Sequence, residues 1–184
     1  ALRGRESPLS QLLPEPPMSI TATYTAYPQS TIDAIKNGDD ISQEPLATLD
    51  LDKMWDALHY LLTGENLMTA LAENGGEPLN DPLSQALTGQ TTLYGDADEG
   101  TYANISDAAQ VTRIAEALAQ TDLAARLHAC PLDTFTAAAI YPDIWDDPAG
   151  YPALEQELHD WYNALRDYYH HAAAAQCGVL VNIG

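Results

Sequence analysis

The chain has 184 residues and a mass of 19.9 kDa, and 46% of its residues are apolar, which argues against disorder. A chain of this size fits one domain and buries about 70% of its extended surface, so it needs no disulfide or metal to hold a core. Its 27 acidic and 7 basic residues give a formal charge of -20, mainly because Lys and Arg are scarce. This charge repels phosphate backbones and anionic lipid, so it argues against direct nucleic-acid or membrane binding and favours a basic protein partner.

The first residues differ in character from the rest of the chain. Residues 1–17 contain four prolines and show no sustained periodicity, which predicts a disordered or extended tail before a folded domain at 18–184. No apolar run has the length of a transmembrane helix, and the start has no apolar signal core, so we expect a cytoplasmic protein. Cys130 and Cys177 are too few to frame the fold and are expected to be reduced thiols.

The first third of the domain predicts one strand and two helices. Alternating apolar and polar residues predict a strand at 20–26, and a short helix is expected around residues 32–35. The clearest helical pattern covers residues 50–63, where apolar residues recur at i, i+4, i+7 and i+11. Asp50 is a suitable N-cap for that helix and Gly64 a suitable residue to end it.

The middle of the chain predicts a short helix and a hairpin. Residues 65–80 have no clear pattern, whereas Asp81 followed by Pro82 predicts the start of a helix that ends at residue 88. Residues 91–94 and 101–105 are candidate strands, and the acidic turn between them predicts a hairpin.

The last third predicts several helices and a final strand. Helices are expected to begin at Ser106 and at Thr121 and to cover residues 131–139 and 152–176. The apolar residues at 179–183 predict a terminal strand in the centre of a sheet, with the first strand as its partner. The predicted class is therefore α+β: a single domain in which a small mixed or antiparallel sheet, with a central hairpin, packs against several helices.

Several segments together carry a resemblance to a known family. These are MSITATY at 18–24, LDLDKMWDALHYLLTG at 49–64, DPLSQALTG at 81–89 and IYPDIWDD at 140–147. In this order and spacing the chain resembles the YfbM-like family of uncharacterised bacterial proteins, over residues 18–184.

The resemblance implies a compact α+β domain, and it supplies no established catalytic residues. Members similar to this chain occur among candidate immunity proteins of bacterial toxin systems, which gives an associational expectation only. Residues 65–80 look longer than the corresponding linker of the family. A loop enlarged at this place is where we expect contacts specific to this protein.

The helix at 50–63 carries one candidate for acid–base chemistry. Asp52, Asp56 and His59 fall on one stripe of this helix, so a carboxylate could orient the histidine as a base. The structural alternative is a histidine satisfied by Asp56, and it is favoured because no nucleophile or third ligand is evident.

Other candidates are also better explained structurally. His159 and His170 on the last helix lie about 16 Å apart, too far to share a metal. Asp143, Asp146 and Asp147 could serve acid–base work or bind a cation. The favoured explanation for them is a turn rich in aspartate that caps the next helix, with Tyr141 and Trp145 anchoring the turn to the core. We therefore assign no catalytic residue, metal or cofactor.

Two main hypotheses of function follow. The first is a non-catalytic acidic binding protein, an inhibitor of the immunity or antitoxin type that sequesters a basic bacterial protein such as a toxin domain. Aromatic residues rimmed by acids would form its interface. The candidates are Tyr94, Asp96, Asp98, Glu99 and Tyr102 on the hairpin, and Trp145, Asp146, Asp147 and Tyr151 on the loop at 141–151.

The alternative is a hydrolase or metal-dependent enzyme that uses Asp143, Asp146 or His59, and it requires these groups to converge in one pocket. A weaker third possibility is a domain without a high-affinity partner, whose charge reflects genome composition.

Overall fold

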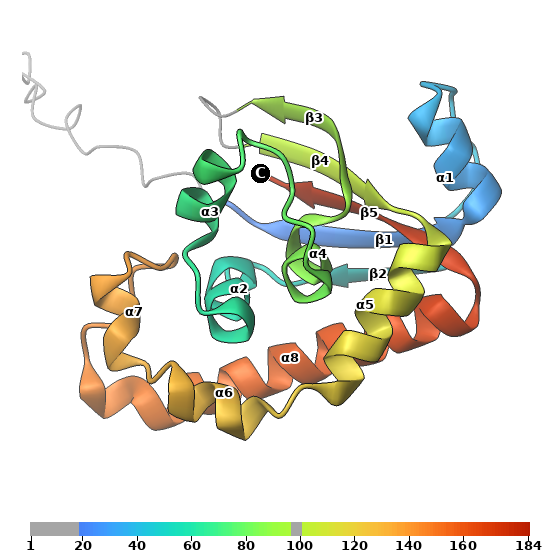
Figure 1. Ribbon diagram of the computed structural model, residues 1–184. Helices are drawn as coiled ribbons and strands as arrows, with labels where there is room; N and C mark the ends of the chain where they lie inside the picture. The colour runs from blue at the N-terminus through green and yellow to red at the C-terminus, as the bar shows by residue number, and fades with distance from the viewer. Residues whose placement is uncertain (1–18, 97–100) are drawn as a thin grey trace, which may run out of the picture.

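A computed structural model describes residues 19–96 and 101–184 (Figure 1). The elements in chain order are β1 (Ala22–Pro28), α1 (Gln29–Lys36), β2 (Ala47–Asp50), α2 (Trp55–Thr63), α3 (Leu67–Glu73), α4 (Pro82–Thr88), β3 (Thr91–Asp96), β4 (Thr101–Ser106), α5 (Ala108–Gln120), α6 (Leu123–Ala129), α7 (Asp133–Ala137), the 3-10 turn η1 (Pro148–Gly150), α8 (Tyr151–Ala174) and β5 (Cys177–Ile183). Within the described part of the chain, no helix combines the length and apolar character that a membrane crossing requires.

The five strands form one sheet in the order β2-β1-β5-β4-β3, and each neighbouring pair is antiparallel. The terminal strand β5 lies in the centre, where Tyr24 of β1 pairs with Val181. β3 and β4 form the hairpin. The predicted α+β class, the pairing of the first with the last strand and the hairpin are thus confirmed.

The two faces of the sheet bury different residues. Ala22, Tyr24 and Ala26 of β1 alternate with threonines and point into the main core, together with Val179 and Val181 of β5. Helices α2, α4, α5 and α8 lie on this side (Figure 1).

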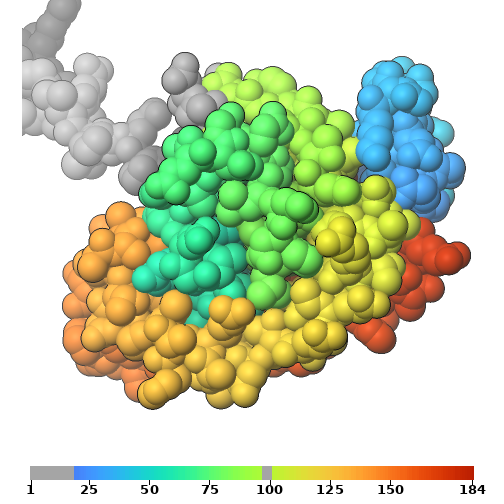
Figure 2. All heavy atoms as spheres, in the orientation of Figure 1, coloured from blue at the N-terminus to red at the C-terminus, as the bar shows by residue number. Residues whose placement is uncertain are grey.

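At one end of the opposite face, α1 packs a small second cluster. There Ile32 contacts Tyr27 and Ile105, with Leu180 beside them. The rest of this face bears polar side chains, such as Thr23 and Asn182, in register across β1 and β5. Figure 2 shows α1 protruding from the main body.

Gly178 lies inside β5 rather than before it, which corrects the predicted start of the strand. A Cβ at this position would lie 2.7 Å from Ile32 Cγ1 and 2.7 Å from the Ser106 carbonyl oxygen. Glycine therefore permits α1 and the end of β4 to approach the central strand closely.

The predicted start of the helix at residue 50 is wrong. Residues 47–50 form the edge strand β2, and Asp50 ends it by accepting a hydrogen bond from the amide of Asp52 at 2.7 Å. Asp52 has a φ of 47°, so the chain turns there before α2 begins at Trp55. Gly64 ends α2 with a φ of 80°, as predicted.

Two predicted helix caps are displaced by one residue. Asp107, not Ser106, caps α5, and Asp122, not Thr121, caps α6, because each aspartate accepts from the backbone amide three residues ahead. Ser106 is instead the last residue of β4 and is fully buried.

Candidate protein-binding site

Helix α3 begins in the segment for which the sequence predicts no regular structure. The side chain of Asn66 caps it by accepting from the Thr69 amide at 2.9 Å, and it also donates to the Ala138 carbonyl at 3.0 Å. Leu67 and Ala70 face the core, whereas the side chain of Met68 is 50% exposed. One end of α3 is thus fixed to the segment after α7, and an apolar residue is left on its outer side.

A glycine turn ends α3 and directs the chain back along it. Gly75 and Gly76 have φ values of 70° and 85°, which side chains disfavour, and the Gly76 amide donates to the Leu71 carbonyl at 2.7 Å. The side chain of Asn74 then donates to the carbonyls of Glu77 and Pro78. These bonds fix the turn beside the hairpin.

The hairpin supplies the other wall. The register between β3 and β4 shifts between Thr92 and Tyr94, so an irregularity lies at Leu93, and both Leu93 and Tyr94 are exposed. The ring of Tyr102 lies across Gly95, since a Cβ at Gly95 would be 3.2 Å from Tyr102 Cδ1. Figure 2 shows the atoms of α3 and the hairpin adjoining along one side of the molecule.

A groove of about 370 Å³ lies between α3 and the hairpin. Its lining is mainly apolar: Met68, Leu71, Ala72, Gly76, Thr92, Gly95 and Tyr102. It leads into a narrow cavity of about 20 Å³ that shares five of these residues and adds others, including Trp55, Thr88 and Asn104. We call the two together the α3–hairpin groove.

One polar atom beside the narrow cavity lacks a hydrogen-bond partner among the described residues. Asn104 is 6% exposed, and its amide nitrogen donates to the Thr88 carbonyl at 2.6 Å. Its Oδ1 accepts no hydrogen bond from any described residue. The orientation of the amide is fixed, because Thr88 presents an acceptor and only the nitrogen of Asn104 can donate to it.

Negative charge surrounds the groove and dominates the described surface. Glu73 and Glu77 follow the lining residues Ala72 and Gly76 directly in the chain, and both are exposed. The described residues include 23 acidic and five basic side chains, and one ion pair joins two of them, Arg166 and Asp167 at 2.9 Å. Most of the negative charge is therefore not compensated by nearby Lys or Arg side chains.

The structure separates the predicted hairpin residues. Tyr102 lines the α3–hairpin groove, whereas Tyr94 lines a hollow of about 300 Å³ that also includes Thr23 and Asn182. Asp96 is half-buried at the end of β3. Asp98 and Glu99 lie outside the described residues.

The predicted residues of the loop at 141–151 have mixed positions. Trp145 is fully buried, donates from its ring nitrogen to the Ile140 carbonyl at 3.0 Å and packs against Phe135 with the two rings tilted by 54°. Trp145 therefore belongs to the core, as the structural explanation of this loop expects, and its assignment as an interface residue is corrected. The hydroxyl of half-buried Tyr151 donates to the Trp145 carbonyl at 3.0 Å.

The aspartates of this loop are exposed. Asp147 accepts from the Ala149 amide at 3.0 Å and so caps η1, which leaves Asp146 as the more available carboxylate.

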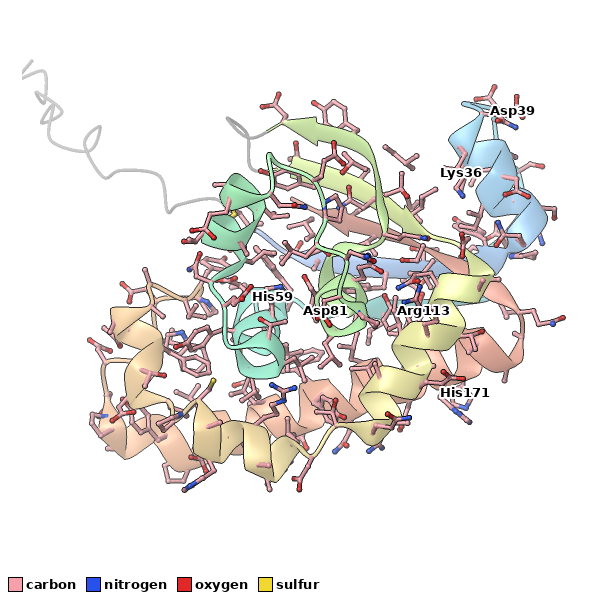
Figure 3. All side chains as sticks on the ribbon, viewed as in Figure 1. Lys36, Asp39, His59, Asp81, Arg113 and His171 are labelled. Atoms are coloured by element: carbon pink, nitrogen blue, oxygen red, sulfur yellow. The ribbon has the colours of Figure 1, made fainter. Side chains whose placement is uncertain are left out.

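His59 is enclosed between α2 and α4, near Asp81 (Figure 3). Its Nδ1 lies 3.1 Å from the Glu65 carbonyl and its Nε2 lies 2.8 Å from Ser84 Oγ. Because a carbonyl only accepts, Nδ1 carries the proton and Nε2 accepts from the serine hydroxyl. Burial lowers the pKa of His59 to about 4, although the contacts with Glu65 and Asp81 oppose this shift.

The hydrolase alternative required His59 to meet Asp143 or Asp146. His59 is fully buried with both ring nitrogens engaged, whereas both aspartates are exposed. Across residues 19–96 and 101–184, no three His, Cys, Asp or Glu side chains are placed to hold a metal ion. The described structure therefore does not assemble these groups into one reactive site.

Asp56 is not the partner of His59, which corrects the structural explanation offered for that histidine. Its Oδ2 accepts from the Tyr141 amide at 2.9 Å, and its Oδ1 is buried without a partner among the described residues. Burial raises the pKa of Asp56 to about 6, and the bond from Tyr141 opposes that shift. Asp56 thus ties α2 to the start of the 141–151 loop.

The most informative residues of the groove escaped the sequence reasoning. Met68 and Leu71 belong to the unpredicted helix α3, although Asn66 followed by apolar residues at 67, 70 and 71 was an available signal for it. Asn104 sits in a strand of only six residues, and no local pattern marks a buried amide with a free acceptor. The length of residues 65–80 was the signal in the sequence that drew attention to the segment containing α3.

The fold and the site define the class of protein: an α+β domain with a central C-terminal strand and an acid-flanked groove on one side. The chain belongs to the family described as Domain of unknown function (DUF1877), which it matches over residues 18–182. It is similar in fold to the solved structure of YfbM from Escherichia coli, a protein of unknown function. The identity is 20%, the TM-score is 0.68, and the match covers 89% of this chain and 99% of that one. No curated protein shows significant similarity to the chain.

Proposed function

We propose that this protein is a non-catalytic binding protein that sequesters a basic bacterial protein in the cytoplasm, as an immunity partner does with a toxin domain. The observation that carries the proposal is the excess of acidic residues, 23 against five basic ones in the described part, with one ion pair between them. An uncompensated field of this sign accelerates association with a cationic partner and disfavours anionic ones.

The geometry supports a binding role in a second way. The α3–hairpin groove is mainly apolar and contains no histidine, cysteine or carboxylate in its described lining. An apolar groove with acids beside it resembles the anchor-and-rim arrangement of protein interfaces. The hydrolase alternative lacks comparable support, because His59 is enclosed and its pKa is too low for an efficient base at neutral pH.

The test is affinity capture from a lysate of the native host, with the tagged chain as bait. Captures are compared at about 0.05 M and 0.15 M salt, and bound proteins are identified by mass spectrometry; the lower salt exaggerates surface electrostatics. An unrelated acidic protein of equal net charge serves as the control bait.

The proposal predicts one basic protein, retained at the higher salt in stoichiometric amount and absent from the control capture. A set of basic proteins shared with the control and lost at the higher salt would contradict it, because the charge would then act without specificity.

A further inference from the structure

One side of helix α3 is apolar and only partly covered. Met68, Leu71 and Ala72 fall at i, i+3 and i+4, so they share a side of the helix, and all three line the groove of about 370 Å³. Met68 is 50% exposed, Leu71 is half-buried and Ala72 is exposed. A second helix packs on a stripe with this spacing, because its ridges fit between side chains three and four residues apart. The open groove leaves room for such a neighbour.

The opposite wall disfavours an extended occupant. β3 is an edge strand of the sheet, and its register with β4 shifts at Leu93. An irregularity of this kind disrupts the edge of a sheet and opposes the addition of a strand from another protein. A helix meets no such obstacle, because its backbone hydrogen bonds are internal and only its side chains enter the groove.

The charge around the groove selects the polar side of that helix. Both walls come from residues 54–112, a stretch with nine acidic residues and no Lys or Arg. Glu73 and Glu77 directly follow the lining residues Ala72 and Gly76, and both are exposed. A helix that carries lysines or arginines beside its apolar face complements this field, whereas an acidic helix is repelled.

We propose that the α3–hairpin groove binds the apolar face of a short, basic, amphipathic helix of a partner protein. Its apolar side chains lie against Met68, Leu71 and Ala72, and its flanking basic side chains lie near Glu73 and Glu77. The flexible thioether of Met68 adapts to side chains of different shape. That the helix belongs to a protein rests on the proposed function, whereas its apolar and basic character rests on the groove.

The experiment titrates the full chain at low salt with three terminally blocked peptides of about 14 residues and follows binding by NMR. The reference peptide has equal numbers of leucines and lysines, with the leucines at helical spacing. The second has the same composition, but leucine and lysine alternate as in a strand. The third keeps the helical spacing and has glutamate in place of lysine. The reporters are the methyl group of Met68 and the backbone amides of Gly76 and Gly95.

We expect the reference peptide to shift these three signals and to bind most tightly. The alternating peptide should bind the groove about five-fold more weakly or less, because it cannot place its leucines on one side of a helix. The glutamate peptide should leave the signals unchanged. Equal groove affinity of the reference peptide and either of the other two would overturn the proposal, as would the absence of groove shifts with all three.

Two matched variants test the location. Met68→Arg places a cation at the mouth of the groove and should weaken the reference peptide about five-fold or more. Leu46→Arg makes the same change in charge at a residue that is also exposed but does not line the groove, and it should leave the affinity nearly unchanged. Equal effects of the two variants would show that the peptide responds only to the total charge, and this would overturn the proposal.

The fates of the two proposals can be told apart. A captured partner that leaves the signals of Met68, Gly76 and Gly95 unchanged would leave the proposed function standing and remove this inference. Groove binding of the reference peptide without any specific partner in the capture would do the reverse.

Discussion

Asp56 and His59 lie one turn apart on α2, and burial shifts their pKa values in opposite directions. The pKa of Asp56 is about 6 in the folded state, against an ordinary value of 3.8. Between these two pH values the native state binds more protons than the unfolded state, so the stability of the protein falls as pH rises. The pKa of His59 is about 4 against an ordinary 6.5, so the unfolded state binds more protons and stability rises with pH. Each contribution reaches about 3 kcal/mol at most, and the two oppose each other between pH 4 and 6.

Replacing Asp56 by a residue that cannot ionise should reveal how much that carboxyl group contributes to the pH dependence of stability. An asparagine side chain at this position would keep an acceptor for the Tyr141 amide, so we expect Asp56→Asn to stabilise the protein by about 1–3 kcal/mol at pH 7, with no gain below about pH 4. Urea unfolding at several pH values measures this difference. The exposed Asp143→Asn serves as the control and should change stability by less than about 0.5 kcal/mol. A gain in stability that does not depend on pH would contradict a raised pKa for Asp56.

His59→Gln should reveal the opposite dependence of stability on pH. Glutamine can still accept from the Ser84 hydroxyl but cannot titrate, so the variant should be less stable by about 1–3 kcal/mol at pH 7 because packing is disturbed. Its deficit relative to the natural chain should shrink as pH falls from about 6.5 toward about 4, since only the natural chain must keep a neutral histidine buried. Unfolding curves that show the same deficit throughout this range would refute a neutral, buried His59.

Among the elements, the close contact of α1 with β5 depends on Gly178. Replacing Gly178 by Ala inserts a methyl group 2.7 Å from both Ile32 Cγ1 and the Ser106 carbonyl oxygen. Because one of these atoms belongs to the backbone, we expect a loss of about 2–3 kcal/mol in thermal or urea unfolding. Gly150→Ala is the control, since a Cβ there meets no atom within 4 Å and its φ is -82°. Equal stability of the two variants would show that the contact relaxes without cost.

Most helices and strands could be predicted because the residues that mark them lie close together in the sequence. Asp81, Pro82 and Gly89 mark both ends of α4, and the continuous apolar run before the end of the chain correctly placed β5 at the centre of the sheet. The start of α2 was missed because β2 forms only through pairing with β1, as in the pair Tyr24 and Leu49, and no residue between 47 and 50 signals that distant contact.

The candidate site was less predictable than the fold. The hairpin and its Tyr102 were identified in advance, since turn and aromatic patterns are local. Trp145 could not be distinguished from an exposed anchor, because its burial depends on packing against Phe135 and a bond to Ile140. The groove itself arises where α3 meets the hairpin, two segments about 25 residues apart whose contact no sequence period encodes.

At the scale of the whole molecule, the negative charge is spread over distant surfaces, which permits a test of where a partner binds. Glu73 and Glu77 flank the end of α3, whereas Asp39 and Asp40 follow α1, on another side of the molecule (Figure 3). We expect Glu73→Gln with Glu77→Gln to weaken binding of the captured basic partner about three-fold at low salt. Asp39→Asn with Asp40→Asn removes the same charge and should change the affinity less.

Salt provides the internal check on this comparison. The difference between the two double variants should vanish at about 1 M salt, where the screening length is about 3 Å. A difference that persists there would mean that the glutamates act through local structure rather than through charge.

The position of β5 in the sheet has a consequence for biosynthesis. Among the described strands, β5, which joins β1 to the hairpin, is synthesised after the other four, so β1 can pair in the sheet only with β2 until residues 177–183 have left the ribosome. At about 5–20 residues per second, the 148 residues between β1 and β5 take about 7–30 seconds to synthesise. During that interval Tyr24, and the apolar faces of α2 and α5 once these helices are made, have no complete sheet to pack against. We therefore expect the nascent chain to bind chaperones that recognise exposed apolar segments.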